Sequence, residues 1–160
     1  MWLPPSCASN IGVLAERLEL ATRWALQYPS LKGFTIGYFG ASTGAAAALV
    51  AASHLPEVAA IVSRGGRPDL AGPALNVVRA PTLLIVGGDD LQVLDLNRRA
   101  LGQLPGEARL QVIPGATHLF EEPGALEQVA ALALGWFQRF FTAASPRSPV
   151  GRDTASTPHS

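Results

Sequence analysis

The sequence predicts an α/β fold with about four parallel strands and helices on both faces of the sheet. Short apolar runs alternate with longer segments of helical periodicity, which is typical of a parallel sheet with two covered faces. Of the 160 residues, 48% are hydrophobic, enough material for a buried core. The runs expected to form strands are 34–39, 58–62, 83–86 and 110–113.

An amphipathic helix is expected before the first strand. Hydrophobic residues recur there at helical spacing, and charged residues lie between them. The helix should end near Tyr28 and Pro29. The apolar stripe consists of Leu14, Leu18, Ala21, Trp24 and Ala25.

Three more helices are expected between and after the strands. They lie at about 45–54, 91–103 and 124–141. We expect residues 11–141 to form the domain and residues 1–10 to be an N-terminal segment without a recognisable match. Ser, Pro, Thr and Arg dominate the last residues without apolar periodicity, so 142–160 are expected to be a disordered tail.

Composition and charge exclude several classes of protein. Twelve basic and twelve acidic residues give a net charge of zero, so the chain lacks the electrostatic footprint of a nucleic-acid-binding protein. The single cysteine, Cys7, cannot form an internal disulfide, and the N-terminus lacks the pattern of a signal peptide. No apolar run reaches the ~18 residues of a membrane-spanning helix. We therefore expect a cytoplasmic protein that binds neither nucleic acid nor membrane.

The segment Gly40-Ala41-Ser42-Thr43-Gly44 links the first expected strand to an alanine-rich helix. This strand, turn and helix is the context of a nucleophile elbow, in which a serine lies in a strained turn. The glycines on either side of Ser42 would let the strand and the helix approach closely. Because a serine needs a base to become a nucleophile, the rest of the chain has to supply one.

His118 is the best placed of the three histidines to act as that base. It lies in a loop that directly follows the expected strand 110–113. His54 lies at the far end of the helix that follows Ser42, remote from the elbow, and His159 lies in the Ser/Thr/Pro tail. One cysteine and scattered histidines show no metal-ligand spacing, so neither a metal nor a cofactor is expected.

Asp89 and Asp90 follow the expected strand 83–86 and could orient the imidazole. Two other interpretations remain open at this point. Asp90 could simply cap the helix that begins at Leu91, since aspartate is a favoured N-cap residue. His118 could bind only a neighbouring loop.

Two other glycine-rich motifs do not match the sequence around Ser42. A dinucleotide fingerprint needs G-x-G-x-x-G and an acidic residue at the end of the next strand, whereas Glu57 precedes that strand. A phosphate-binding loop needs a lysine at the start of the helix, which here begins with alanines.

The segments GYFGASTGAAAAL, APTLLIVGGDD and PGATHLFEEPGALEQVA resemble the α/β-hydrolase superfamily, and most closely its dienelactone-hydrolase-like branch. The likeness runs from about Leu14 to Phe141. It implies a partial α/β-hydrolase fold without the usual N-terminal strands. It also implies hydrolysis of a small ester, thioester or lactone by Ser42, His118 and Asp90.

The resemblance also separates the two aspartates. Members of this branch often have Gly-x-x-Asp after the penultimate strand, which assigns the triad acid to Asp90 and makes Asp89 its neighbour. Dienelactone hydrolases have cysteine at the elbow, whereas this chain has Ser42. The lactone substrate in that name is therefore not carried over.

Two further residues are expected near the substrate. The backbone amide of Thr43, which follows the nucleophile, can donate to an oxyanion. Arg64, together with Arg67, lies after the second strand at the same edge of the sheet and could hold an anionic group. Solvated loop arginines are the alternative interpretation.

The strand before Ser42 is expected to form an open edge of the sheet. A single helix precedes it, whereas α/β-hydrolases normally have several strands there, followed by a loop that supplies the second oxyanion donor. Unpaired backbone groups on Thr35 to Phe39 would favour self-association. The expectation is thus a truncated hydrolase with reduced activity. The alternative is a hydrolase-derived binding or interaction module without useful catalysis.

Overall fold

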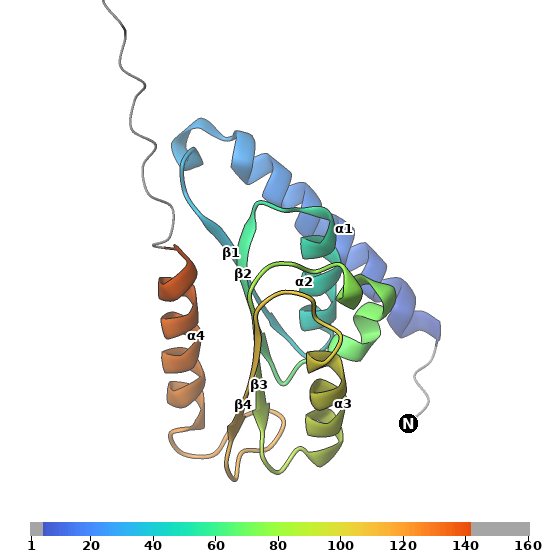
Figure 1. Cartoon of the computed structure of the whole chain (residues 1–160), viewed down its shortest axis with the longest axis vertical. Helices are drawn as coiled ribbons and strands as arrows, with labels where there is room; N and C mark the ends of the chain where they lie inside the picture. The colour runs from blue at the N-terminus through green and yellow to red at the C-terminus, as the bar shows by residue number, and fades with distance from the viewer. Residues whose placement is uncertain (1–4, 142–160) are drawn as a thin grey trace, which may run out of the picture.

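A computed structural model describes residues 5–141 of the chain. Four parallel strands form one sheet in the order β1-β2-β3-β4 (Figure 1). The strands are β1 (Ile36–Ala41), β2 (Val58–Arg64), β3 (Thr82–Gly87) and β4 (Ala108–Ile113). The predicted α/β fold with a parallel sheet is therefore confirmed.

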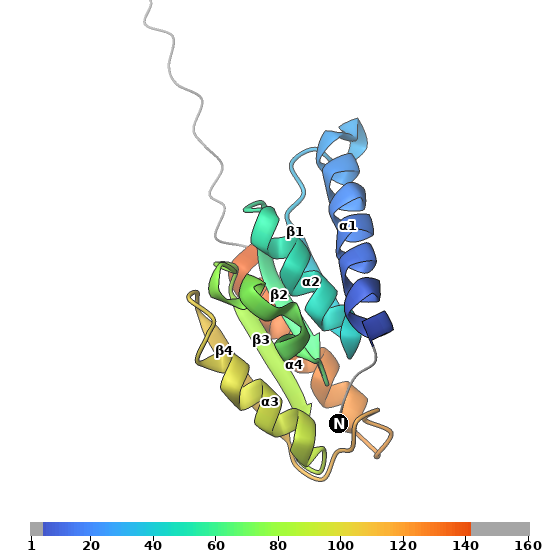
Figure 2. The same cartoon turned by 90° about the vertical axis from the view of Figure 1, so that its right-hand side faces the viewer.

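Helices cover both faces of this sheet, as predicted. The helices α1 (Pro5–Gln27), α2 (Thr43–His54) and α3 (Leu91–Leu101) lie on one face, and α4 (Ala125–Phe141) lies on the other (Figures 1 and 2). Side chains alternate along β2 between the two cores. Ile61 packs in the core beneath α2, whereas Ala60 and Val62 pack in the core beneath α4.

Helix α2 is buried between the sheet and α1. Seven of its twelve residues are buried, and six of these seven are alanines. A helix that is apolar all round is stable only when it is covered on several sides. The small side chains let β1 and α1 approach α2 from opposite sides, which places α1 in an outer layer (Figure 2).

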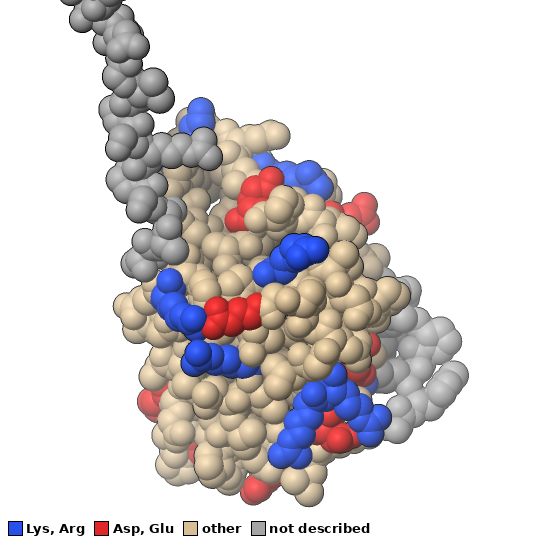
Figure 3. Space-filling model, in the orientation of Figure 1, with Lys and Arg blue, Asp and Glu red and all other residues tan. Residues whose placement is uncertain are grey.

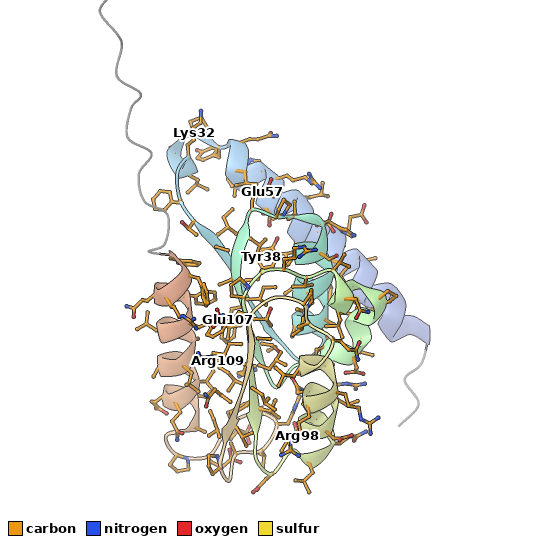
Figure 4. The ribbon with its side chains drawn as sticks, in the orientation of Figure 1. Lys32, Tyr38, Glu57, Arg98, Glu107 and Arg109 are labelled. Carbon is orange, nitrogen blue, oxygen red and sulfur yellow. The ribbon has the colours of Figure 1, made fainter. Side chains whose placement is uncertain are left out.

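Two polar contacts tie α1 to the rest of the fold. The hydroxyl groups of Tyr38 in β1 and Thr22 in α1 lie 2.6 Å apart and are buried. Figure 4 marks the position of Tyr38. Burial raises the pKa of Tyr38, although the hydrogen bond with Thr22 acts in the opposite direction. Nδ1 of His54, at the end of α2, lies 2.6 Å from a carboxylate oxygen of Glu19. His54 therefore has a structural contact far from Ser42.

Most predicted elements are present with shifted ends. Strand β1 begins at Ile36 instead of residue 34 and continues through Gly40 and Ala41, which pair with Ser63 and Arg64 of β2. Helix α1 begins at Pro5, so residues 5–10 belong to the first predicted helix. Its predicted buried stripe is wrong, because Leu14 and Trp24 are exposed while Ile11, Ala15 and Thr22 are buried. The short 3₁₀ helices η1 (Pro29–Leu31) and η2 (Pro68–Asn76) were not predicted. The predicted disordered tail, 142–160, lies outside the described residues.

Strand β1 forms one edge of the sheet. Among the described residues it pairs with β2 alone, as the sequence predicts. Large apolar side chains are exposed beside this edge, since Phe34 is 71% and Phe39 is 52% accessible. Within residues 5–141, no helix combines the length and the apolar character needed to cross a membrane.

Candidate active site

Ser42 lies between the end of β1 and the first residue of α2. Its φ is 48° and its ψ is −123°, a conformation that an L-residue rarely adopts. A Cβ on Gly40 would lie 2.7 Å from Cα of Ala45, so the close approach of β1 and α2 requires this glycine. A Cβ on Gly44 would contact nothing within 4 Å, and the expectation that Gly44 serves close packing is wrong.

Two hydrogen bonds join Ser42, His118 and Asp90. Oγ of Ser42 lies 2.9 Å from Nε2 of His118, although the two residues are 76 positions apart. Nδ1 of His118 lies 2.7 Å from Oδ2 of Asp90. Because an ionised carboxylate only accepts hydrogen bonds, Nδ1 carries the proton and Nε2 is left to accept from the Ser42 hydroxyl. The structure thus brings together the three residues that the sequence singles out.

Asp90 occupies the N-cap position of α3, but its side chain makes no capping hydrogen bond. The carboxylate contacts His118 instead, and the side chain is only 17% exposed. The neighbouring Asp89 has an exposed side chain, and its backbone amide donates to the carbonyl of Ala116 at 3.0 Å. Of the two aspartates, Asp90 is therefore the one whose side chain contacts the imidazole.

The loop that carries His118 is held by its own residues. The amide and the hydroxyl of Thr117 both donate to Oε1 of Glu122, at 3.0 and 2.5 Å. The hydrogen bond from the Thr117 side chain lowers the pKa of Glu122. Phe120 adopts a left-handed φ of 57° and buries its ring beneath α4. These contacts fix the backbone on both sides of His118.

Neither Glu122 nor Phe120 was predicted from the sequence to support the site. A glutamate five residues after Thr117 was the available signal for the loop contact, because the side chain can reach back across a tight turn. The buried position of Phe120 depends on packing against α4, which local sequence does not reveal.

Arg64 lies at the carboxyl end of β2, next to the elbow. Its carbonyl accepts a hydrogen bond from the amide of Ser42 at 3.3 Å. Its guanidinium carbon lies 5.8 Å from the ring centroid of Phe120, and its Nε is buried without a hydrogen-bond partner. Arg67, in contrast, forms two hydrogen bonds with the carboxylate of Asp69, at 2.9 and 2.7 Å. Arg67 therefore forms an ion pair with Asp69.

The backbone amide of Thr43 belongs to the first turn of α2. Amides at this position have no partner within the helix and point toward the helix N-terminus, where anions are stabilised. The side chain of Thr43 is exposed. The geometry is compatible with the donor role that the sequence predicts.

Charged side chains of both signs occur on the surface of the molecule (Figure 3). Acidic and basic side chains are interspersed on the face shown in Figure 3. No group of three or more histidine, cysteine, aspartate or glutamate side chains among residues 5–141 could hold a metal ion. A cavity of about 520 Å³ lies at the amino ends of β2 and β3, where it is bordered by Pro56, Arg79 and Pro81. The Ser42 site lies at the opposite end of the sheet and has no part in that cavity.

Comparison with known proteins gives two kinds of match at high sequence identity. A dienelactone hydrolase from Anabaena variabilis is 59% identical, with a TM-score of 0.81 over 82% of this chain and 61% of that one. A protein of Mycobacterium tuberculosis, whose name proposes phosphoribosyl transferase activity, is 60% identical over 80% of this chain and 29% of its own length. The chain thus spans less than two thirds of either relative.

More distant comparisons agree on the architecture. An esterase domain from Rhodothermus marinus is 18% identical, with a TM-score of 0.67 over 79% of this chain and 69% of that one. A family model described as "BAAT / Acyl-CoA thioester hydrolase C terminal" matches residues 15–79. The chain has part of an α/β-hydrolase fold, as predicted, and it is similar to a dienelactone hydrolase in sequence and structure.

Proposed function

We propose that the chain acts as a serine hydrolase on a small ester, thioester or lactone. The observation that carries the proposal is the pair of hydrogen bonds from Ser42 to His118 and from His118 to Asp90, at 2.9 and 2.7 Å. This is the geometry in which a base can remove the proton of a serine while an acid fixes the imidazole tautomer.

The reaction proceeds through an acyl-enzyme. Oγ of Ser42 attacks the carbonyl carbon of the substrate while its proton moves to Nε2 of His118, and Asp90 stabilises the resulting imidazolium. The bond to the leaving group then breaks, and His118 returns the proton to that group. A water molecule, deprotonated by His118, releases the acyl group as an acid and restores the Ser42 hydroxyl.

The Thr43 amide supplies one oxyanion donor in this proposal. Such a donor contributes about 2.7–4 kcal/mol of transition-state stabilisation. Arg64 is the candidate contact for an anionic group on the substrate, since its carbonyl accepts a hydrogen bond from the Ser42 amide and the residue therefore adjoins the nucleophile.

The names of the relatives bear on substrate class in different ways. The dienelactone hydrolase and the thioester-hydrolase family model agree with acyl transfer to water. The transferase name belongs to a protein of which this chain spans 29%, and most of that protein lies outside the matched part. Acyl hydrolysis is therefore the function that we propose for this chain.

A binding or interaction module without useful catalysis is the second candidate. It is supported by the open edge of β1 and the exposed Phe34 and Phe39 beside it. In this alternative, a strand from another chain would pair with β1.

A fluorophosphonate probe distinguishes the two functions, because it labels an activated serine and ignores an inert one. We expect labelling of the wild type, loss of labelling in Ser42→Ala, and unchanged labelling in Ser53→Ala. Ser53 is a suitable control because its hydroxyl donates to the carbonyl of Val50 within α2. A folded wild type that is not labelled would overturn the hydrolase proposal and favour the binding module.

A further inference from the structure

Asn97 is a polar residue in the interior of α3, and its exposure is 0%. Its side-chain Nδ2 donates two hydrogen bonds, to the carbonyl of Gly66 at 3.0 Å and to the carbonyl of Val93 at 2.8 Å. Its Oδ1 is buried without a partner. Burial of an unpaired amide oxygen is unfavourable, so the stabilising part of this side chain is its donor end.

The Gly66 carbonyl belongs to a loop, residues 64–67, that contacts the nucleophile elbow on both sides. The carbonyl of Arg64 accepts from the amide of Ser42 at 3.3 Å, and the amide of Arg67 donates to the carbonyl of Ser42 at 3.1 Å. Both backbone polar groups of Ser42 therefore bond to this loop.

The same loop packs tightly against the start of α2. A Cβ on Gly66 would lie 2.6 Å from Cβ of Ala45 and 2.0 Å from Oγ of Ser63. The loop backbone therefore lies directly beneath the first turn of α2. A displacement of Gly66 would move the backbone groups that hold Ser42.

We infer that Asn97 is a positioning residue for the nucleophile, which it holds through the 64–67 loop. The inference rests on the proposed serine hydrolase function. Ser42 is held at φ 48°, where an L-residue is strained, and such a conformation persists only when the surroundings determine it. Asn97 also lies on the helix whose N-cap is Asp90. Helix α3 therefore supports two residues of the site. Asn97 in its interior supports Ser42, and Asp90 at its N-cap supports His118.

Asn97→Ser and Asn97→Ala test this link. Serine can still bond to the carbonyl four residues earlier, which is Val93, but it is too short to reach Gly66. Alanine loses both bonds. We expect the kcat for p-nitrophenyl acetate to fall about tenfold in both variants, with little change in KM, because the nucleophile geometry changes while substrate binding does not. The pH dependence that reports His118 should stay in place, since its bond to Asp90 is untouched.

Ala100→Gly is the matched control. Ala100 is buried one turn further along α3, and glycine destabilises a helix relative to alanine. This variant should keep its kcat at temperatures where all proteins are folded. If Asn97→Ser matched the wild type, or if the loss in Asn97→Ser matched that in Ala100→Gly, the inference would be overturned.

A second measurement does not depend on catalysis. In Asn97→Ser, the Arg67 and Ser42 amides should exchange with solvent about tenfold faster than in the wild type, and Ala100→Gly should not show this local effect. If the wild type is inactive but these amides respond, the proposed hydrolase function fails while the structural link stands. If the wild type is active and the amides do not respond, the positioning role is wrong.

Discussion

Asp90 stands at the N-cap of α3, yet its carboxylate bonds to Nδ1 of His118 at 2.7 Å and leaves the helix uncapped by a side chain. The cost of an unused cap is typically about 1 kcal/mol. Asp90 is therefore a residue type that is typical of helix starts, but its side chain bonds to His118, which lies 28 positions further along the chain.

Asp90→Asn should lower kcat for an activated ester strongly, by up to about 10⁴-fold, because the amide favours the wrong tautomer of His118. Asp89→Asn should have a mild effect, since the Asp89 side chain is exposed and its backbone makes the contact to Ala116. Steady-state kinetics with p-nitrophenyl acetate provide the measurement. The opposite ranking of the two variants would assign the role to Asp89.

Ser42→Gly should be more stable than Ser42→Ala by about 1 kcal/mol. Both variants lose the hydroxyl, but only glycine relieves the strained backbone, which costs about 1–3 kcal/mol, against a glycine entropy cost of about 0.5–1 kcal/mol. Urea unfolding of the two variants gives the difference directly. Equal stability would mean that the elbow is not strained in solution.

The contribution of Glu122 to stability should disappear in acid. Its pKa is lowered in the folded chain by the hydrogen bond from Thr117, so the stabilisation is complete above the ordinary glutamate pKa and is lost as the pH falls through the folded value. Glu122→Gln cannot titrate at this position. The difference in unfolding free energy between wild type and Glu122→Gln should therefore decrease from neutral to acidic pH. A difference that does not change with pH would contradict the prediction.

Tyr38 should make the chain sensitive to alkaline pH. Burial of the Tyr38 hydroxyl disfavours its ionised form, and this is the largest cause of its raised pKa. Because the folded pKa is raised, stability is complete below the ordinary tyrosine pKa of about 10 and is lost as the pH rises through the folded value. Thermal unfolding should show a smaller alkaline loss in Tyr38→Phe than in the wild type.

The β1 edge should promote self-association, which we propose from its unpaired backbone and exposed apolar side chains. Phe39→Lys places a charge on this edge and should reduce association, because edge lysines oppose strand pairing. Val112→Lys is the control, since Val112 is exposed on β4, at the opposite end of the sheet from β1. Light scattering measures both. A monomeric wild type, or an equal effect of the two variants, would show that the edge does not associate.

The sequence by itself determined the fold class and the order of the candidate site. Four apolar runs alternate with helical segments, and parallel strands then place their carboxyl ends together. Ser42, Asp90 and His118 each follow a different run. Their proximity was therefore predictable without knowledge of any side-chain contact, and the family resemblance favoured Asp90 over Asp89.

Only the tertiary structure decided how the neighbouring polar residues are used. Whether Asp90 caps α3 or contacts His118, and whether Arg67 is solvated or paired with Asp69, depends on rotamers selected by packing. In the sequence, Asn97 is one more polar position on a predicted helix. Hydrophobic periodicity indicates contacts within a turn or two of the helix, but it cannot indicate a hydrogen bond to a carbonyl 31 residues away. Contacts of that range are set by the docking of α3 against the 64–67 loop, which exists only once the sheet has formed.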